Sequence, residues 1–363
     1  SQAGKAITTG DNNVAVGSSA GLDLTSGGEN IFIGKLAGAN ITTSGDNTAI
    51  GYAALETATT ALSNTAIGTG AMGTVAASQA VNGCVSLGRG ALNGSSSTTT
   101  GINYTISIGQ NSLYSLTTGA GNIAIGYSAL TQHTTGARNI AIGHGAMDQT
   151  AGDADDAPAS IDNIFVGYDA GGGDWANDED SNYNVGIGNY VMDAVMDGAL
   201  NNVALGHYAL SSITTGDSNV GLGGSAGLLI TTGSNNVSMG YLSADALNTG
   251  SNNVAIGYVS LSTATTAYEN VAIGVGAMQD VTADVAVARC VVIGKGAVNG
   301  GGTQTTGIDG TVAIGYNSLN ALTTGGGNIA IGYEVAKNLT TGNSNTIIGH
   351  QAGQNQDDSS YNT

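Results

Sequence analysis

The sequence predicts an all-β fold, a parallel β-solenoid (a β-roll or β-helix) of about nineteen coils with about 17 residues in each. A phrase of Asn, three apolar residues and Gly, such as Asn122 to Gly126, recurs along the whole chain. Large and small side chains alternate inside this phrase, which is the period of a β-strand. The composition, with 60 Gly, one Pro and 9% charged residues, opposes both helix and disorder.

An anchor Gly closes each phrase and marks the period. Most anchors are 17 residues apart, which is too short for helical repeats of about 33 to 47 residues. A unit this short buries nothing alone, so a continuous core requires that the units stack. At about 4.8 Å per strand, the stack would be a rod about 90 Å long. The anchors are Gly17, Gly34, Gly51, Gly68, Gly88, Gly109, Gly126, Gly143, Gly167, Gly188, Gly206, Gly223, Gly240, Gly257, Gly274, Gly294, Gly315, Gly332 and Gly349.

The chain also contains a duplication. The anchors from Gly17 to Gly143 recur as Gly223 to Gly349, with the same irregular spacings, at an offset of 206 residues. We therefore expect one solenoid domain with two eight-coil blocks, a divergent acidic centre and a polar tail. These span 1–353 for the domain, 1–151 and 207–357 for the blocks, 152–206 for the centre and 354–363 for the tail.

Each unit is expected to contain a strand, a Gly corner, a second segment and a turn. In the unit around Gly126, Ile123 and Ile125 flank the small Ala124, and we expect the Ile side chains to fill the core. The second segment ends in pairs such as Ala129-Leu130 and is expected to form a second strand. Thr-Thr-Gly then supplies a polar turn.

An Asn stands four residues before most anchors, and stacking would align these side chains in a ladder. Cys84 and Cys290 occupy two of the Asn slots, and Thr105 and Thr311 occupy the slots that follow them. On this plan the two Cys are about 50 Å apart, so we expect buried thiols, with pairing between chains as the alternative. The ladder residues include Asn13, Asn30, Asn47, Asn64, Asn122 and Asn139.

The formal net charge of −19 argues against several partners. Seven Lys and Arg residues cannot form the basic surface that nucleic acids or anionic membranes require. No run approaches the roughly 20 apolar residues of a membrane span, so we expect no membrane insertion. The chain starts inside the repeat, without Met or an apolar signal region, and we interpret it as a processed product or a piece of a longer chain.

Motifs that look catalytic are explained by the repeat itself. Gly17–Gly21 and Gly223–Gly227 match G-x-S-x-G, but each is an anchor followed by Ala-Gly, with no strand-to-helix turn expected. Gly68, Gly70 and Gly73 spell G-x-G-x-x-G without a helix behind them. We therefore expect no catalytic residue, no enzyme activity and no cofactor other than the calcium considered next.

The centre departs from the repeat. Between Gly143 and Gly188 the spacing widens to 24 and 21 residues, and the only Pro and the only Trp lie there, so we expect two extended loops. Carboxylates are preferred calcium ligands, and the alternatives here are a calcium site and simply solvated acidic loops. The candidate calcium ligands are Asp153, Asp155, Asp156, Asp178 and Asp180, and the candidate binding residues are Asp174, Trp175, Asp178 and Asp180.

Aromatic residues follow several anchors and are expected to form short ladders. The ladders would steady neighbouring coils, and stacking on the sugar rings of a cell-surface glycan is the alternative. One ladder comprises Tyr127, His144 and Tyr168, and the other Tyr316, Tyr333 and His350; the four Tyr residues are the candidates for binding.

Thr-Thr pairs such as Thr117-Thr118 recur at one turn of the coil. A regular Thr array on a flat face is how ice-binding solenoids order water, so ice binding is the alternative function. Against it, adjacent residues of a strand cannot both point outward, and the pairs abut Gly as in a turn.

The phrase N-x-A-I-G-x-x-A, best matched at Asn122–Gly126, Asn139–Gly143 and Asn253–Gly257, resembles the repeat of trimeric autotransporter adhesin heads and of bacteriophage tail fibres. The resemblance implies a left-handed parallel β-roll, side-by-side association of three chains, and adhesion or host recognition in place of catalysis. The small residues Ala124 and Ala141 would form the flat face for such packing. The unit of the adhesin heads is shorter, so the Thr-Thr-Gly turn is an addition in this chain.

We therefore expect a structural rod of an extracellular, cell-surface or virion fibre. It would associate with itself as a homotrimer or a polymer. Adhesion to a receptor or glycan would use the central loops or the exposed turns.

Overall fold

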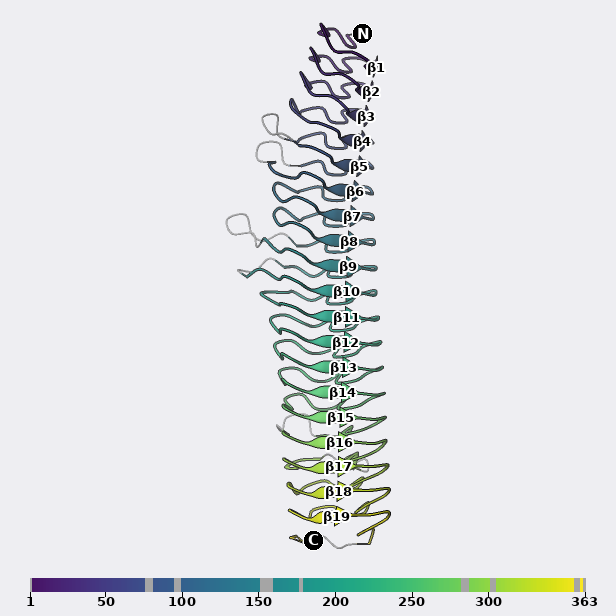
Figure 1. Cartoon of the computed structure of the whole chain (residues 1–363), viewed down its shortest axis with the longest axis vertical. Coiled ribbons are helices and arrows are strands. Elements are labelled where there is room, and N and C mark those ends of the chain that lie inside the picture. Colours follow the sequence, from purple (N-terminus) through teal and green to yellow (C-terminus); the bar gives the residue numbers. More distant parts are fainter. Residues whose placement is uncertain are drawn as a thin grey trace. The chain divides into compact units, whose positions relative to one another are not determined.

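The computed structural model describes residues 2–75, 81–94, 99–150, 159–175, 179–281, 287–300, 305–355 and 360–361. Within these ranges the chain is an all-β parallel solenoid without an α-helix, which confirms the predicted fold class (Figure 1). It divides into two compact units, Ser1–Asn184 with Val195–Gly198, and Val185–Ala194 with Ala199–Thr363. The boundary between the units falls inside the divergent centre of the sequence.

Each coil contributes one strand of three residues. The first unit contains β1 (Val14–Val16), β2 (Ile31–Ile33), β3 (Thr48–Ile50), β4 (Thr65–Ile67), β5 (Val85–Leu87), β6 (Ile106–Ile108), β7 (Ile123–Ile125), β8 (Ile140–Ile142) and β9 (Ile164–Val166). The second unit contains β10 (Val185–Ile187), β11 (Val203–Leu205), β12 (Val220–Leu222), β13 (Val237–Met239), β14 (Val254–Ile256), β15 (Val271–Ile273), β16 (Val291–Ile293), β17 (Val312–Ile314), β18 (Ile329–Ile331) and β19 (Thr346–Ile348).

Within each unit, equivalent residues of successive strands pair in parallel. Ile123 pairs with Ile140, a step of 17 residues along the chain. The longer step from Ile140 to Ile164 keeps the same register, because the additional residues lie outside the strands. The irregular spacings therefore change the turns and leave the strand pairing unaltered.

The strands face the opposite way from the prediction. Ala124 is fully buried, whereas Ile123 and Ile125 are partly exposed. Ala141 is buried in the same way between two more exposed Ile residues. The predictions that Ile fills the core and that Ala forms an outer packing face are therefore wrong.

The second segment explains this orientation, because its long side chains already fill the space in front of the strand. A Cβ atom placed on Gly221, the centre of β12, would lie 2.8 Å from the Leu210 side chain. Conversely, the large Phe32 at the centre of β2 lies over Gly38, where an added Cβ atom would come within 2.4 Å of its ring. At these two levels a large side chain in one layer therefore faces a glycine in the other.

The predicted second strand is also replaced by a turn. Ser128 and Leu130 adopt left-handed φ values of +54° and +51°, which no strand contains. Their N–H groups still bond to neighbouring coils, Ser128 to the Gln110 carbonyl at 3.0 Å and Leu130 to the Ala146 carbonyl at 2.9 Å. The coils are thus hydrogen-bonded on both sides with only one strand each.

The corner and the ladder are as predicted. Gly126 has φ +144°, and a Cβ atom there would lie 2.1 Å from the Gly143 carbonyl oxygen, so only Gly fits. The Asn139 side-chain amide donates to Asn122 Oδ1 at 3.3 Å and to the Ser160 carbonyl at 2.8 Å. Both Cys residues are free and buried, as expected.

Candidate functional site

Each unit presents an outward surface that we call the aliphatic face, formed by the first and third residues of every strand. The first residues are all Val, Ile or Thr, and the third are all Val, Ile, Leu or Met. Many of these side chains are well exposed, with Val16 at 57% and Leu205 at 51%. The described strands place no charged side chain on this surface.

The aliphatic face is a continuous, mostly apolar exposed surface along the strands of each unit. At about 4.8 Å per strand and about 3.3 Å per residue, the nine strands of the first unit span a geometric area of about 400 Å². The largest apolar patch on a typical soluble protein has a comparable area, about 300 to 600 Å², and is often functional. The β-branched residues that predicted strands therefore also supply a candidate interface.

The aromatic ladders form where the sequence placed them. The Tyr127 and His144 rings stack at 5.0 Å between centroids, and His144 stacks on Tyr168 at 5.2 Å. Tyr316, Tyr333 and His350 repeat the arrangement at 5.3 and 5.1 Å. Neighbouring rings cover the faces inside each ladder, so those faces are closed to a ligand.

The acidic centre is only partly described by the structure. Asp153, Asp155, Asp156 and Asp178 lie outside the described residues, while Asp174 and Asp180 are exposed. The described residues contain no group of three or more His, Cys, Asp or Glu that could hold a metal ion. Calcium binding in the centre stays a prediction.

Trp175 occupies a different environment from the one expected of a binding residue. Its side chain is 1% exposed and packs edge-on against Phe165 at 5.6 Å between ring centroids. A Cβ atom added to Gly171 would lie 2.8 Å from the Phe165 ring, so Gly171 makes room for this aromatic pair. The structure thus gives Trp175 a packing role in the core.

The Thr pairs line one turn of the coil, and the two Thr residues of a pair lie in different environments. In several pairs the first Thr is half-buried and its hydroxyl donates to the carbonyl of the equivalent Thr in the next coil, as from Thr117 to Thr134 at 2.7 Å and from Thr214 to Thr231 at 3.1 Å. The hydroxyls of Thr134 and Thr265 are buried without a hydrogen-bond partner in the described structure. In several pairs the second Thr, such as Thr215, is exposed. In the pairs of Thr117 and Thr214, the first Thr therefore serves coil-to-coil bonding.

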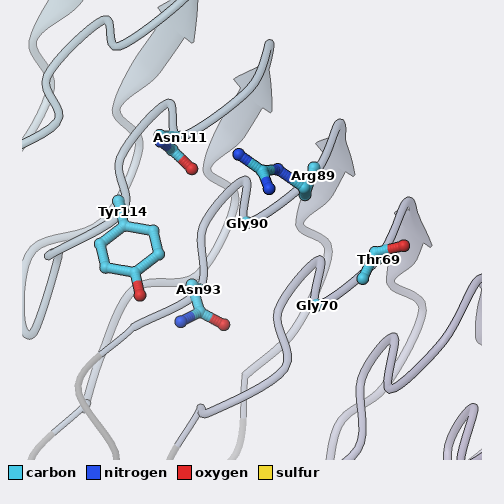
Figure 2. Close-up of a pocket in the computed structure, with 7 residues that line it drawn as sticks. All are labelled: Thr69, Gly70, Arg89, Gly90, Asn93, Asn111 and Tyr114. Carbon is cyan, nitrogen blue, oxygen red and sulfur yellow. The ribbon is translucent and has the colours of Figure 1, made fainter.

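A cavity of about 370 Å³, absent from the predictions, lies beside the corners that follow β4, β5 and β6. Figure 2 shows the Arg89 guanidinium extending toward Asn111, and the Tyr114 hydroxyl directed toward Asn93. Gly70 and Gly90 also line the cavity. A Cβ atom on Gly70 would find its nearest neighbour, Asn93 Oδ1, only at 4.0 Å, so this part of the cavity is open.

Tyr114 separates this cavity from a second one of about 500 Å³. Asn93 and Tyr114 line both cavities, and Thr74, Ser115 and Thr117 line only the second. The Tyr114 side chain is 44% exposed. An exposed aromatic ring thus stands between two hollows whose walls are mainly amides and hydroxyls.

The cavities lie in an unusual stretch of the sequence. Residues 57–147 contain no Asp or Glu, although the chain has 26 in total, and they contain Arg89 and Arg138. Arg138 pairs with Asp162 at 2.6 Å, whereas no ion pair joins Arg89 to the described residues. The gap in acidic residues was the sequence signal that could have located this site.

His133 is the one fully buried imidazole of the described residues. Its Nδ1 lies 3.0 Å from the Thr150 hydroxyl, which itself donates to the Met147 carbonyl at 3.2 Å. Nδ1 therefore carries the proton, and Nε2 faces the Asn139 amide at 3.4 Å. Burial lowers the pKa of His133 to about 4, so the ring is neutral at pH 7.

Among the described residues, no helix is long and apolar enough to cross a membrane. No protein-family model, curated protein or solved structure matches the chain. A function for this chain therefore has to be argued from the fold and the surfaces described above.

Proposed function

We propose that the protein is a structural module of an extracellular, cell-surface or virion fibre, whose chains associate side by side through the aliphatic face. The observation that carries this proposal is the double column of mostly branched and apolar side chains, without a charge, along the strands of each unit. Burying such a surface against a second copy removes apolar area from water.

The flatness of the face favours a second copy over a small ligand. Each strand repeats the same residue types at the same height, so one copy presents regular ridges and grooves to another. A closed, symmetric assembly would hide every aliphatic face, and the homotrimer implied by the resemblance satisfies this condition. The resemblance also implies a left-handed coil.

Adhesion is the second part of the proposal. The corners and turns carry the chemically varied residues, including the ladders of Tyr127, Tyr168, Tyr316 and Tyr333, and the exposed Asp174 and Asp180. A cell-surface glycan or receptor would contact these positions. A non-enzymatic role agrees with the repeat, whose conserved plan places packing residues in every coil.

Ice binding remains the alternative function. It has less support, because in several pairs, such as those of Thr117 and Thr214, the first Thr already uses its hydroxyl to bond the next coil. An ice-binding protein would act as a monomer and would show thermal hysteresis in solution.

Sedimentation velocity across a range of protein concentrations tests the association. Leu205→Lys places an ammonium group on the aliphatic face, and Leu229→Lys is the matched control, because Leu229 is similarly exposed at 45% but lies in a turn. Burying the unpaired charge at an interface should weaken association by at least about tenfold for Leu205→Lys and little for the control. A purely monomeric wild-type chain, or equal effects of both variants, would overturn the proposal, and thermal hysteresis would favour ice binding.

A further inference from the structure

The cavity beside Arg89 has the features of a ligand site, and we propose that it binds an anionic sugar residue, with Arg89 holding the carboxylate or sulfate group. The inference deepens the adhesive part of the proposed function, because it names a ligand class for one surface of the fibre. It does not depend on association through the aliphatic face.

The first argument is charge. Arg89 is exposed, forms no ion pair with the described residues and lies in the 57–147 stretch that lacks Asp and Glu. In a chain of net charge −19, this is a local reversal of the electrostatic surface. A guanidinium donates two parallel hydrogen bonds to a carboxylate or an ester-linked sulfate, which gives both affinity and orientation.

The second argument is the lining of the cavity. The amides of Asn93 and Asn111 can donate to and accept from hydroxyl groups, and both residues are half-buried. The Tyr114 ring adds an amphipathic surface with a hydroxyl at its edge. A hydroxyl-rich ring with one negative charge matches this set better than a phosphate polymer, which needs many cations, or an apolar peptide side chain.

The third argument is size. The cavity of about 370 Å³ falls within the range of about 300 to 1,000 Å³ that is usual for small-molecule sites. The second cavity continues on the other side of Tyr114, with Asn93 shared between the two. An oligosaccharide could therefore place successive residues on either side of the ring.

The duplicated block supplies a natural comparison. There Lys295 replaces Arg89 and Asn320 replaces Tyr114. The Asn320 amide donates to the Gly296 carbonyl at 2.8 Å, and the Asn299 amide to the Gly276 carbonyl at 3.2 Å. Those amides bond to glycines that lie two residues after the anchors of the second block, whereas the space above Gly70, the position equivalent to Gly276, is open.

Titration calorimetry on the full chain tests the site with four probes: a galacturonic acid trisaccharide, 3′-sialyllactose, a sulfated lactose and neutral lactose. At least one acidic probe should bind, with neutral lactose at least about tenfold weaker, and the probe that binds identifies the anionic group. Arg89→Ala should weaken binding by at least about tenfold, and Lys295→Ala should leave it unchanged.

A filling variant separates loss of binding from loss of folding. Gly70→Ser puts a side chain into the cavity at a left-handed position where Ser128 stands in another coil, so the fold should tolerate it. Binding should fall by at least about tenfold while circular dichroism and the melting temperature change little. Absence of binding to all acidic probes, equal binding of neutral lactose, or full binding by Arg89→Ala would overturn the inference, whatever the sedimentation result.

Discussion

Residues 51–147 and 257–353 share one coil plan and differ in the chemistry that they carry. Gly126 and Gly332 have φ values of +144° and +143°, and both turn the corner after a strand. Yet the first stretch contains one acidic residue, Glu56, while the second contains five, namely Glu269, Asp280, Asp284, Asp309 and Glu334. The duplication therefore preserved the packing positions and let the surface charge diverge.

The positions that differ between the two stretches are mainly those whose side chains point away from the core. Ser128 and the equivalent Glu334 have φ values of +54° and +49°, so the same left-handed backbone accepts a small or a charged residue. Some core slots diverged as well, for example that of His133, which corresponds to Leu339. Comparing matched positions thus separates what the scaffold requires from what each stretch adds.

The largest expected effect concerns the shared scaffold. Gly126→Ala and Gly332→Ala each force a Cβ atom against the carbonyl of the next anchor, at 2.1 and 2.4 Å, in a region of φ and ψ that essentially only Gly adopts. Each should lower the free energy of unfolding by about 3 kcal/mol or more, measured by chemical denaturation. Gly70→Ala, at φ +65° with open space, is the control and should cost about 1 kcal/mol. A strong effect in only one stretch would contradict a common scaffold.

The second prediction concerns the pH dependence of stability, and it applies only to the first stretch, which contains His133. Because burial lowers the pKa of His133 to about 4 from 6.5, the unfolded chain binds the proton first as the pH falls. The stability that the neutral ring contributes is complete above pH 6.5 and is lost as the pH falls toward 4. Between pH 7 and pH 4 this loss amounts to about 3 kcal/mol.

His133→Leu introduces the residue found at the matched position, Leu339, and should remove the loss of stability between pH 7 and pH 4. At pH 7 the variant should be within about 1 kcal/mol of the wild type, because Leu occupies the same slot elsewhere. Denaturation at a series of pH values provides the measurement. Identical pH profiles for variant and wild type would show that His133 does not titrate as its burial requires.

The smallest expected effect concerns the interrupted Asn ladder. The hydroxyls of Thr105 and Thr311 are buried without a hydrogen-bond partner in the described structure, and each follows a Cys in the ladder. Cys84→Asn would offer an acceptor to Thr105 and should raise stability by about 1 kcal/mol.

Cys290→Asn should gain less, because the Thr311 N–H already donates to the Ile308 carbonyl at 3.2 Å. The melting temperatures of the two variants give the comparison. A loss of stability in both would indicate that the slot is too small for Asn.

Much of the fold followed from the sequence, because the repeat fixes positions that only one residue type can occupy. The corner at Gly126 and the amide ladder through Asn122 and Asn139 have no alternative partners in a stack of identical coils. Which face of the strand points into the core was not determined in this way. Ile123, Ala124 and Ile125 alternate equally well with either face inward, and the choice depends on Leu130 and Leu210 from a segment that the pattern assigned to a strand.

The candidate sites were harder to predict than the fold. Trp175 stood out as a unique residue in an acidic loop, but its contact with Phe165 depends on Gly171, which the repeat pattern did not distinguish from other glycines. No sequence motif marks Arg89 as a binding residue, because its significance lies in the missing carboxylates around it and in the empty space over Gly70. In a sequence rich in Gly, the pattern does not show which glycines leave open space and which are packed against a neighbour.

The step of 17 residues between paired strands has a mechanical consequence. The backbone bonds between coils run along the direction in which the coils of a unit stack, so tension along that direction loads them in series. Each coil that detaches would release about 17 residues, or roughly 60 Å of extended chain. Such a unit would lengthen coil by coil under load, absorbing work at each step, and the coils that remain would keep their own hydrogen bonds and core.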